Sequence, residues 1–297
     1  MTIKAQQRIM NAQNRMLQLL QIKIVDDIDK ICAENNLKYY IIGGTLLGAV
    51  RHKGFIPWDD DIDLVMYRDD YNRFIKIIQE KYSSKYFIQT FDTDKNYTRY
   101  IAKVRLNNTI HRESYFENAG INEGVYVDIF PLDNVRKNGG VELFLRGSIV
   151  RWIFAFKTIK HNCQITKTGP KYYIGKLLRC FLFLIPDGLA NSLFEYACQK
   201  DNGKECKYTT NFASHFKWKK QLFENGVFGD GCKLEFEDRK YSAPCKYKEI
   251  LERLYGADYM QLPPKEKRVT HDIVKLDFGP YREGLETEVK KEMQKGL

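Results

Sequence analysis

The chain has 297 residues, 43% of them hydrophobic, so it can bury a substantial core and is not an intrinsically disordered protein. Its net charge of +10 indicates an anionic partner such as nucleic acid, a phosphorylated substrate or an anionic membrane surface. No nucleic-acid-binding motif accompanies the charge, so we expect no nucleic-acid partner. The sequence contains no apolar run of the roughly 20 residues that cross a bilayer, and we expect no signal peptide.

Seven cysteines occur without a C-x-x-C pair. This spacing favours free thiols in a reducing compartment over a zinc site or a disulfide framework. We therefore expect a cytoplasmic protein that contacts at most the inner face of the cell membrane.

The N-terminal part of the chain alternates between helical and strand patterns. Apolar residues recur every three or four positions over residues 8–35, which predicts a long helix. Residues 37–42 form a β-rich run, and residues 45–51 are expected to form a short helix with Thr45 as its N-cap. The elements predicted next are a strand over 62–66, a helix over 69–81 and strands over 86–90, 100–106 and 124–130, the last ended by Pro131.

The composition changes near residue 140. Apolar stretches with helical periodicity cover residues 143–156, 172–185 and 189–198, and they carry several Lys and Arg residues. Short strands are expected over 208–245 and a helix over 246–256. An α/β part is therefore followed by a helical part and then by a mixed C-terminal segment.

Four carboxylates lie within five residues, at Asp59, Asp60, Asp61 and Asp63. They repel one another, so holding them together is costly without a cation. On a strand, Asp61 and Asp63 would point to the same face, about 6–7 Å apart, where they could chelate a divalent ion. Oxygen ligands favour Mg²⁺ or Mn²⁺ over zinc. For Asp59 and Asp60 a solvated loop is the less favoured alternative.

A third carboxylate would complete such a metal site. Asp128 lies between apolar residues of a predicted strand, where an ionised side chain is expensive to bury unless a cation compensates it. We predict that Asp128 is the third metal ligand and that it orients or deprotonates an attacking hydroxyl. Asp133 follows closely, and capping of a turn explains it about as well as function does.

Gly43 and Gly44 lie between a predicted strand and a predicted helix. Backbone amides of such a turn can approach a phosphate closely. Together with Asp61 and Asp63 they predict a phosphate cradle and a metal site across one cleft, where the metal would neutralise phosphate charge. This combination predicts metal-assisted phosphoryl chemistry.

Basic and aromatic residues between and beyond these motifs could also bind substrate. Arg51, His52 and Lys53 lie between the glycines and the acids, and one or two of them are expected to contact phosphate. Lys103 could project into the same cleft from its strand. Trp58 is either a core residue or a lid over the site.

These motifs resemble the LicD family, the bacterial phosphocholine transferases, whose relatives include fukutin-related protein. The likeness is close over residues 43–63, continues over 127–133, and returns over 254–264 and at His271. Relative to the family pattern, one extra residue precedes Asp258 and Tyr259. The resemblance implies an α+β fold with a nucleotidyltransferase-like mixed β-sheet core, flanking helices and a mainly helical additional region.

The resemblance also implies an activity. It is the Mg²⁺-dependent transfer of a phosphorylated alcohol, foremost phosphocholine from CDP-choline, to a hydroxyl of a glycan acceptor with release of CMP. The acceptor would be a cell-surface or lipid-linked glycan, such as lipopolysaccharide or a teichoic-acid precursor. Asp61, Asp63 and Asp128 would then be the catalytic metal ligands. The implied substrate-binding residues are Gly43, Gly44, Thr45, Arg51, Lys53, Trp58, Lys103 and His271.

Alternatives remain open at this point. A choline head suits an aromatic cage, for which Trp58 and Tyr126 are candidates, whereas a ribitol or glycerol head needs hydrogen-bond donors. The enzyme could instead transfer the nucleotide itself. A non-enzymatic adaptor that binds anionic glycan is a third reading, against which the complete carboxylate set argues.

We predict three segments. These are a nucleotidyltransferase-like catalytic core over residues 1–138, a helical insertion over 139–205, and a mixed segment over 206–297 that completes the domain. In the insertion, the cations Arg146, Arg151, Lys157 and Lys160 lie among aromatic and β-branched residues. Such helices could lie on an anionic membrane surface, or pack as an ordinary helical subdomain.

Overall fold

The fold was analysed in a computed structural model of the chain. It describes residues 3–117, 119–136, 139–161, 173–174, 177, 181–214, 219–264, 266, 268 and 272–294. His271 and most of the predicted helix over 172–185 lie outside the described residues.

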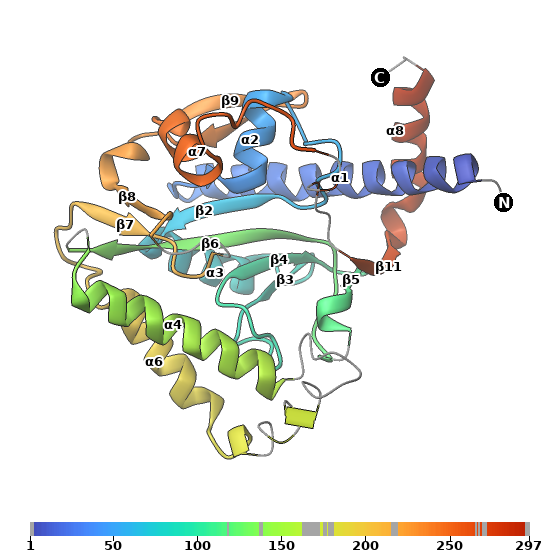
Figure 1. Cartoon of the computed structure of the whole chain (residues 1–297). Coiled ribbons are helices and arrows are strands. Elements are labelled where there is room, and N and C mark those ends of the chain that lie inside the picture. Colours follow the sequence, from blue (N-terminus) through green and yellow to red (C-terminus); the bar gives the residue numbers. More distant parts are fainter. Residues whose placement is uncertain are drawn as a thin grey trace.

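A seven-stranded mixed sheet forms the centre of the structure (Figure 1). Only β2 and β6 pair in parallel within it; the remaining pairs of this sheet are antiparallel. The predicted α+β class with a mixed sheet is thereby confirmed. The order is β1 (Tyr40–Ile41), β2 (Asp63–Tyr67), β6 (Tyr126–Val135), β4 (Ala102–Leu106) and β3 (Tyr86–Gln89), and β7 (Tyr208–Thr210) with β8 (Leu222–Glu224) extends from β6.

Helices pack against this sheet and against one another (Figure 1). The long α1 (Ile3–Glu34) and α3 (Arg68–Lys81) pack against sheet strands, and α8 (Arg282–Gln294) packs against α1. Above the sheet in this view, α2 (Gly43–Arg51) contacts α7 (Tyr247–Tyr255). The helices predicted over 8–35, 69–81 and 246–256 are therefore confirmed.

Two further strand pairs complete the fold. β9 (Cys232–Phe236) pairs with β10 (Arg239–Ala243), and β5 (Ile110–Glu113) pairs with β11 (Ile273–Asp277). The main hydrophobic cluster joins residues from the N-terminal part with residues 223–289, so the C-terminal segment completes the core. Short 3₁₀ helices are η1 (Ser114–Phe116), η2 (Asn225–Val227) and η4 (Gly279–Tyr281).

A helical pair packs below the sheet in the view of Figure 1. It consists of α4 (Val141–Lys160) and α6 (Asp187–Gln199), which contact each other and enclose a second hydrophobic cluster. Both predicted helices are confirmed. Within the part of the chain that is described, no helix has both the length and the apolar character needed to cross a membrane.

Two local predictions are wrong. Pro131 does not end its strand, because β6 continues to Val135. The proline falls between the last residue paired with β4, Ile129, and the first paired with β7, Asp133, so its missing N–H is tolerated there. Thr45 is not an N-cap either: α2 begins at Gly43, and the Thr45 hydroxyl accepts a hydrogen bond from the backbone N–H of Asp63 at 2.9 Å.

Candidate active site

Strand register brings three charged side chains together across the sheet. The parallel pairing of β2 and β6 sets Asp63 opposite Asp128, and the antiparallel pairing of β4 and β6 sets Lys103 opposite the same aspartate. Neighbouring strands lie about 4.8 Å apart, so residues opposite one another share a face and come into contact distance. The sheet therefore places two carboxylates and one ammonium side by side.

Lys103 forms a buried ion pair with Asp128. Its Nζ lies 2.8 and 3.0 Å from the two carboxylate oxygens, and both side chains are buried. The same Nζ lies 3.3 Å from the centroid of the Tyr126 ring. Lys103 thus compensates the charge of Asp128, a contact that the predicted role in phosphate binding did not include.

The carboxylates of the aspartate run converge near Asp63. Burial raises the pKa of Asp63 well above its usual value, and the charges of Asp61, then Asp128, then Asp59 raise it further, while Lys103 opposes them. Asp61 precedes the strand, because β2 begins at Asp63, so its position depends on the loop rather than on strand alternation.

The loop provides a further candidate metal-binding trio. Among the described residues, Asp59, Asp60 and Asp61 each offer a carboxylate oxygen, and these oxygens all lie within 4.8 Å of one another. An all-oxygen set of this kind fits Mg²⁺ or Mn²⁺, and a divalent cation would offset the repulsion that raises the pKa of Asp63. The residues that are present therefore fit a hard divalent ion, with Asp59 and Asp60 more central than the sequence suggested.

Gly43 and Gly44 make room for these carboxylates. A Cβ at Gly43 would lie 2.8 Å from Oδ2 of Asp63, and a Cβ at Gly44 would lie 2.8 Å from Oδ2 of Asp59. Gly43 also has a φ of +58°, which a residue with a side chain rarely adopts. The two glycines thus bring the start of α2 against the acidic cluster, with Gly44 on the cavity wall.

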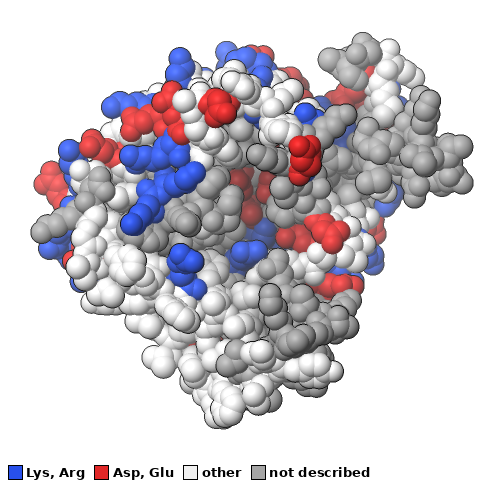
Figure 2. Space-filling model, viewed as in Figure 1, with Lys and Arg blue, Asp and Glu red and all other residues white. Residues whose placement is uncertain are grey.

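A cavity of about 890 Å³ opens above the cluster. In Figure 2 acidic side chains lie inside the hollow at the centre of this face, with basic side chains below them. The charged residues that line the cavity are Arg51, Asp59, Asp60, Asp61, Asp63, Arg99, Lys103, Glu113, Asp128 and Asp258. Aromatic residues of its wall are Trp58, Phe116, Phe130, Tyr255 and Tyr259.

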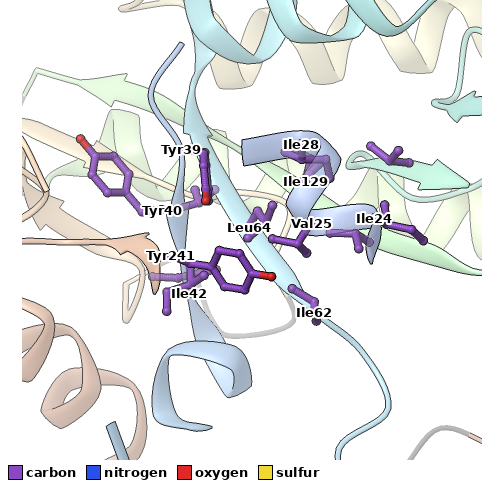
Figure 3. Packing of buried hydrophobic residues seen from close by; sticks show 14 of the residues in the cluster. Ile24, Val25, Ile28, Tyr39, Tyr40, Ile42, Ile62, Leu64, Ile129 and Tyr241 are labelled. Carbon is purple, nitrogen blue, oxygen red and sulfur yellow. The ribbon is translucent and has the colours of Figure 1, made fainter. Parts of the chain in front are cut away.

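The strands that carry the cluster are held from behind by the core. Apolar side chains of α1, such as Ile24 and Ile28, pack beside Ile62, Leu64 and Ile129 of the β2 and β6 region (Figure 3). These side chains are 0–1% exposed. Close packing of this kind leaves the backbone at Asp63 and Asp128 little room to move.

The two aromatic candidates for a choline cage differ in position. Trp58 lines the cavity, and the guanidinium of Arg268 lies over its ring, 4.3 Å from the centroid. Tyr126 is only 1% exposed, between Lys103 and the stacked ring of His111, so its predicted role as a cage residue is wrong. Tyr126 shares a strand face with Asp128, two residues further on, but Lys103 and His111 cover its ring.

The predicted basic residues Arg51 and Lys53 also differ in their position relative to the cavity. Arg51 lines the cavity and donates hydrogen bonds from Nη1 to the backbone oxygens of Tyr259 and Gln261, at 2.9 and 3.1 Å, which holds that segment against the cavity. Lys53 is exposed, has a φ of +60°, and is not among the described residues that line the cavity. Asp133 pairs with Arg68 at 2.7 Å in the core, so it is a structural residue.

Sequence reasoning missed several residues of this site. Arg99 and Glu113 line the cavity from segments without a recognisable motif. Arg99 stacks its guanidinium over Tyr115, 4.5 Å from the ring centroid, and forms no ion pair with another described residue. Tyr255 lies within the C-terminal motif, and burial followed by the charges of nearby aspartates raises the pKa of its hydroxyl. Tyr255 could have been predicted as a site residue from its place in the family-like segment 254–264.

Comparisons with known proteins place the acidic cluster within a known family of domains. The LicD/FKTN/FKRP nucleotidyltransferase domain matches residues 36–147, which contain the acidic run and Asp128. The lipopolysaccharide cholinephosphotransferase LicD of Haemophilus influenzae is 31% identical over 272 residues, which cover 87% of this chain and 96% of that protein. The chain belongs to the LicD family.

A shorter match links the chain to transferases of animals. The ribitol 5-phosphate transferases FKRP of human and mouse are 53% identical to it over 34 residues, which cover 11% of this chain and 7% of theirs. By their names, the bacterial relative transfers cholinephosphate and the animal relatives transfer ribitol 5-phosphate.

Proposed function

We propose that this chain is a Mg²⁺-dependent transferase that moves a phosphorylated alcohol, phosphocholine from CDP-choline, to a hydroxyl of a cell-surface glycan and releases CMP. The observation that carries the proposal is the convergence of Asp59, Asp61, Asp63 and Asp128 in one cavity that also contains guanidinium groups. Such a cavity suits a diphosphate and a divalent ion. The cholinephosphotransferase named among its relatives supports the choice of donor.

The carboxylates and the basic residues have complementary tasks in this reaction. Asp61 and Asp63 would hold the ion, which neutralises charge on the donor diphosphate. The acceptor oxygen attacks the phosphorus that bears the alcohol, and the bond from that phosphorus to the CMP oxygen breaks. Asp128, held by Lys103, orients the hydroxyl and takes its proton. Arg99 offsets the charge that develops on the phosphoryl oxygens.

The cavity wall supports a cationic head group. Trp58 already accepts a cation on its ring face, the guanidinium of Arg268. A trimethylammonium group is attracted to an indole face in the same way. Ribitol phosphate is the alternative head group, favoured by the match to FKRP over 34 residues.

The test compares nucleotide-activated donors. Purified protein with Mg²⁺ is incubated with CDP-choline, CDP-ribitol or CDP-glycerol and with lipopolysaccharide that lacks phosphocholine. Free CMP is measured by chromatography, and the acceptor is analysed by mass spectrometry. CMP release with phosphocholine on the acceptor supports the proposal. CMP attached to the acceptor would instead identify a nucleotidyltransferase, and the absence of both products with all donors would overturn the transferase assignment.

Single substitutions then assign the metal ligands. Asp61→Asn and Asp63→Asn should each abolish the Mg²⁺-dependent reaction. The third ligand is Asp128 by our prediction, whereas the loop geometry favours Asp59, so Asp59→Asn and Asp128→Asn are compared for the Mg²⁺ concentration at half-maximal rate. Asp230→Asn is the control, because its side chain is 98% exposed and pairs with Lys38 outside the cavity.

A further inference from the structure

Helix α4 buries cations together with apolar residues and exposes further apolar side chains. Its cations Arg146, Lys157 and Lys160 are buried, whereas Phe144 and Trp152 are 57% and 76% exposed. An ordinary surface helix turns its apolar residues toward the core and its charges toward water. The outer face of α4 is thus apolar, which the sequence pattern alone did not reveal.

The buried cations fix this orientation of the helix. Arg146 donates to Asp201 at 2.6 Å, and Lys160 lies 3.2 Å from Asp187 at the start of α6. Turning α4 to bury its outer face would leave these charges without partners, at a cost of several kcal/mol. Of the four cations Arg146, Arg151, Lys157 and Lys160, only Arg151 is therefore exposed.

The apolar surface continues from α4 over α6 and the segment before it. Between Val141 and Tyr196 lie fourteen of the eighteen large hydrophobic residues that are exposed among the described ones. On α6, Leu189, Leu193 and Tyr196 are 64%, 44% and 63% exposed and share one helix face by their spacing. We call the exposed apolar residues of 141–196 the α4–α6 apolar face. In Figure 2 the lower part of the molecule, over α4 and α6, shows mainly uncharged surface.

The charge of this region indicates the nature of the partner. Between Glu142 and Asp187 the sequence contains eight Lys or Arg residues and no Asp or Glu. Among the described ones Arg151 is exposed, whereas Arg146, Lys157 and Lys160 are buried against partners within the fold. Aromatic and aliphatic side chains combined with such a positive excess are typical of surfaces that insert into the headgroup region of anionic membranes. Exposed apolar residues gathered on one part of a protein are typical of an interaction surface.

We propose that the α4–α6 apolar face docks on the surface of an anionic lipid bilayer, with Trp152 and Phe144 inserted among the headgroups. The face adjoins the candidate active site, because Ala213 lines the cavity and packs against the cluster that α4 and α6 enclose. A glycan carried on a lipid would thus be presented beside the acidic cluster. Bilayer docking itself is measured without donor or acceptor, so its outcome is independent of the proposed transfer.

Vesicle flotation tests the proposal with the full chain. Vesicles of phosphatidylglycerol and phosphatidylethanolamine should bind the protein roughly tenfold or more tightly than vesicles of phosphatidylcholine. Trp152→Glu and Leu193→Glu should each weaken binding roughly tenfold, because they place a carboxylate among anionic headgroups. Met293→Glu, at a residue that is 58% exposed on α8, is the matched control and should bind as the unaltered chain does.

A second measurement separates insertion from simple charge attraction. Trp152→Phe keeps the face apolar, so it should still bind but should lose the component of fluorescence that brominated lipid quenches. Binding that Trp152→Glu leaves unchanged, or that 0.5 M salt removes completely, would overturn the proposal, because screening acts on charges alone. A second copy as the occupant would also overturn it, and would appear as a dimer that Trp152→Glu dissociates.

Discussion

Replacing Lys103 by Met would keep most of the side-chain length and remove the charge that faces Asp128. The Nζ atom of Lys103 contacts both carboxylate oxygens, at 2.8 and 3.0 Å, in a buried position. Removing one member of a buried ion pair leaves the other charge uncompensated, which costs about 3–5 kcal/mol. Lys103 also opposes the rise in the pKa of Asp63, so its loss adds to the repulsion in the cluster. We expect the free energy of unfolding to fall by that amount at pH 7.

Urea denaturation followed by circular dichroism measures this change. Because Lys103→Met/Asp128→Asn removes both charges of the pair, we expect the double variant to recover about 2 kcal/mol of the loss. Lys23→Met is the matched control: Lys23 pairs with Glu288 at the surface, both side chains are more than 40% exposed, and the expected change is below about 1 kcal/mol. A loss for Lys103→Met no larger than for Lys23→Met would refute the reasoning.

Three further predictions follow from the site and its surroundings. Gly43→Ala should lower the free energy of unfolding by about 1–2 kcal/mol, because Gly43 has a φ of +58°; Gly284→Ala, in α8 with open space around it, should lower it by nothing. Burial lowers the pKa of His111 to about 4, so the free energy of unfolding falls as the pH drops below the usual histidine value. Acidification from pH 7 to 5 should cost about 2 kcal/mol. In urea titrations, His111→Phe should remove that loss. Mg²⁺ at a hundredfold excess over its Kd should stabilise the chain by about 2.7 kcal/mol in thermal unfolding, and Asp61→Asn should abolish the gain.

Local periodicity predicted most elements of the fold correctly. The helical repeat of residues 8–35 and the β-rich runs near β2 and β4 correspond to α1 and to central strands. The pair of β5 and β11 was missed, because strands with sequences such as IHRE and IVKLD alternate charged and apolar residues too briefly to stand out. Their pairing brings together two segments that lie far apart in the chain and form a two-stranded sheet of their own.

The candidate site was predictable only where residue chemistry is unusual. Four aspartates within five residues predict a cation site because they repel one another, and the isolated charge of Asp128 in an apolar strand indicates the same function. The partners of these charges were not predictable from the sequence. A lysine such as Lys103 looks the same in the sequence whether it lies at the surface or pairs with a buried carboxylate. Arg99 and Glu113 reach the cavity through loop and edge positions that no local pattern encodes.

The sequence by itself determined the family of this protein and the residue types of its candidate site, since the acidic run, the glycines before it and the family motifs are visible without any fold. Only the tertiary structure decided which charges meet. Strand register set Asp63 and Lys103 on either side of Asp128, and the close approach of Gly43 and Gly44 placed α2 against the acids. The packing of α6 likewise decided that the cations of α4 point inward and its aromatic residues outward. Side-chain contacts between distant segments depend on packing and register, which local patterns do not carry.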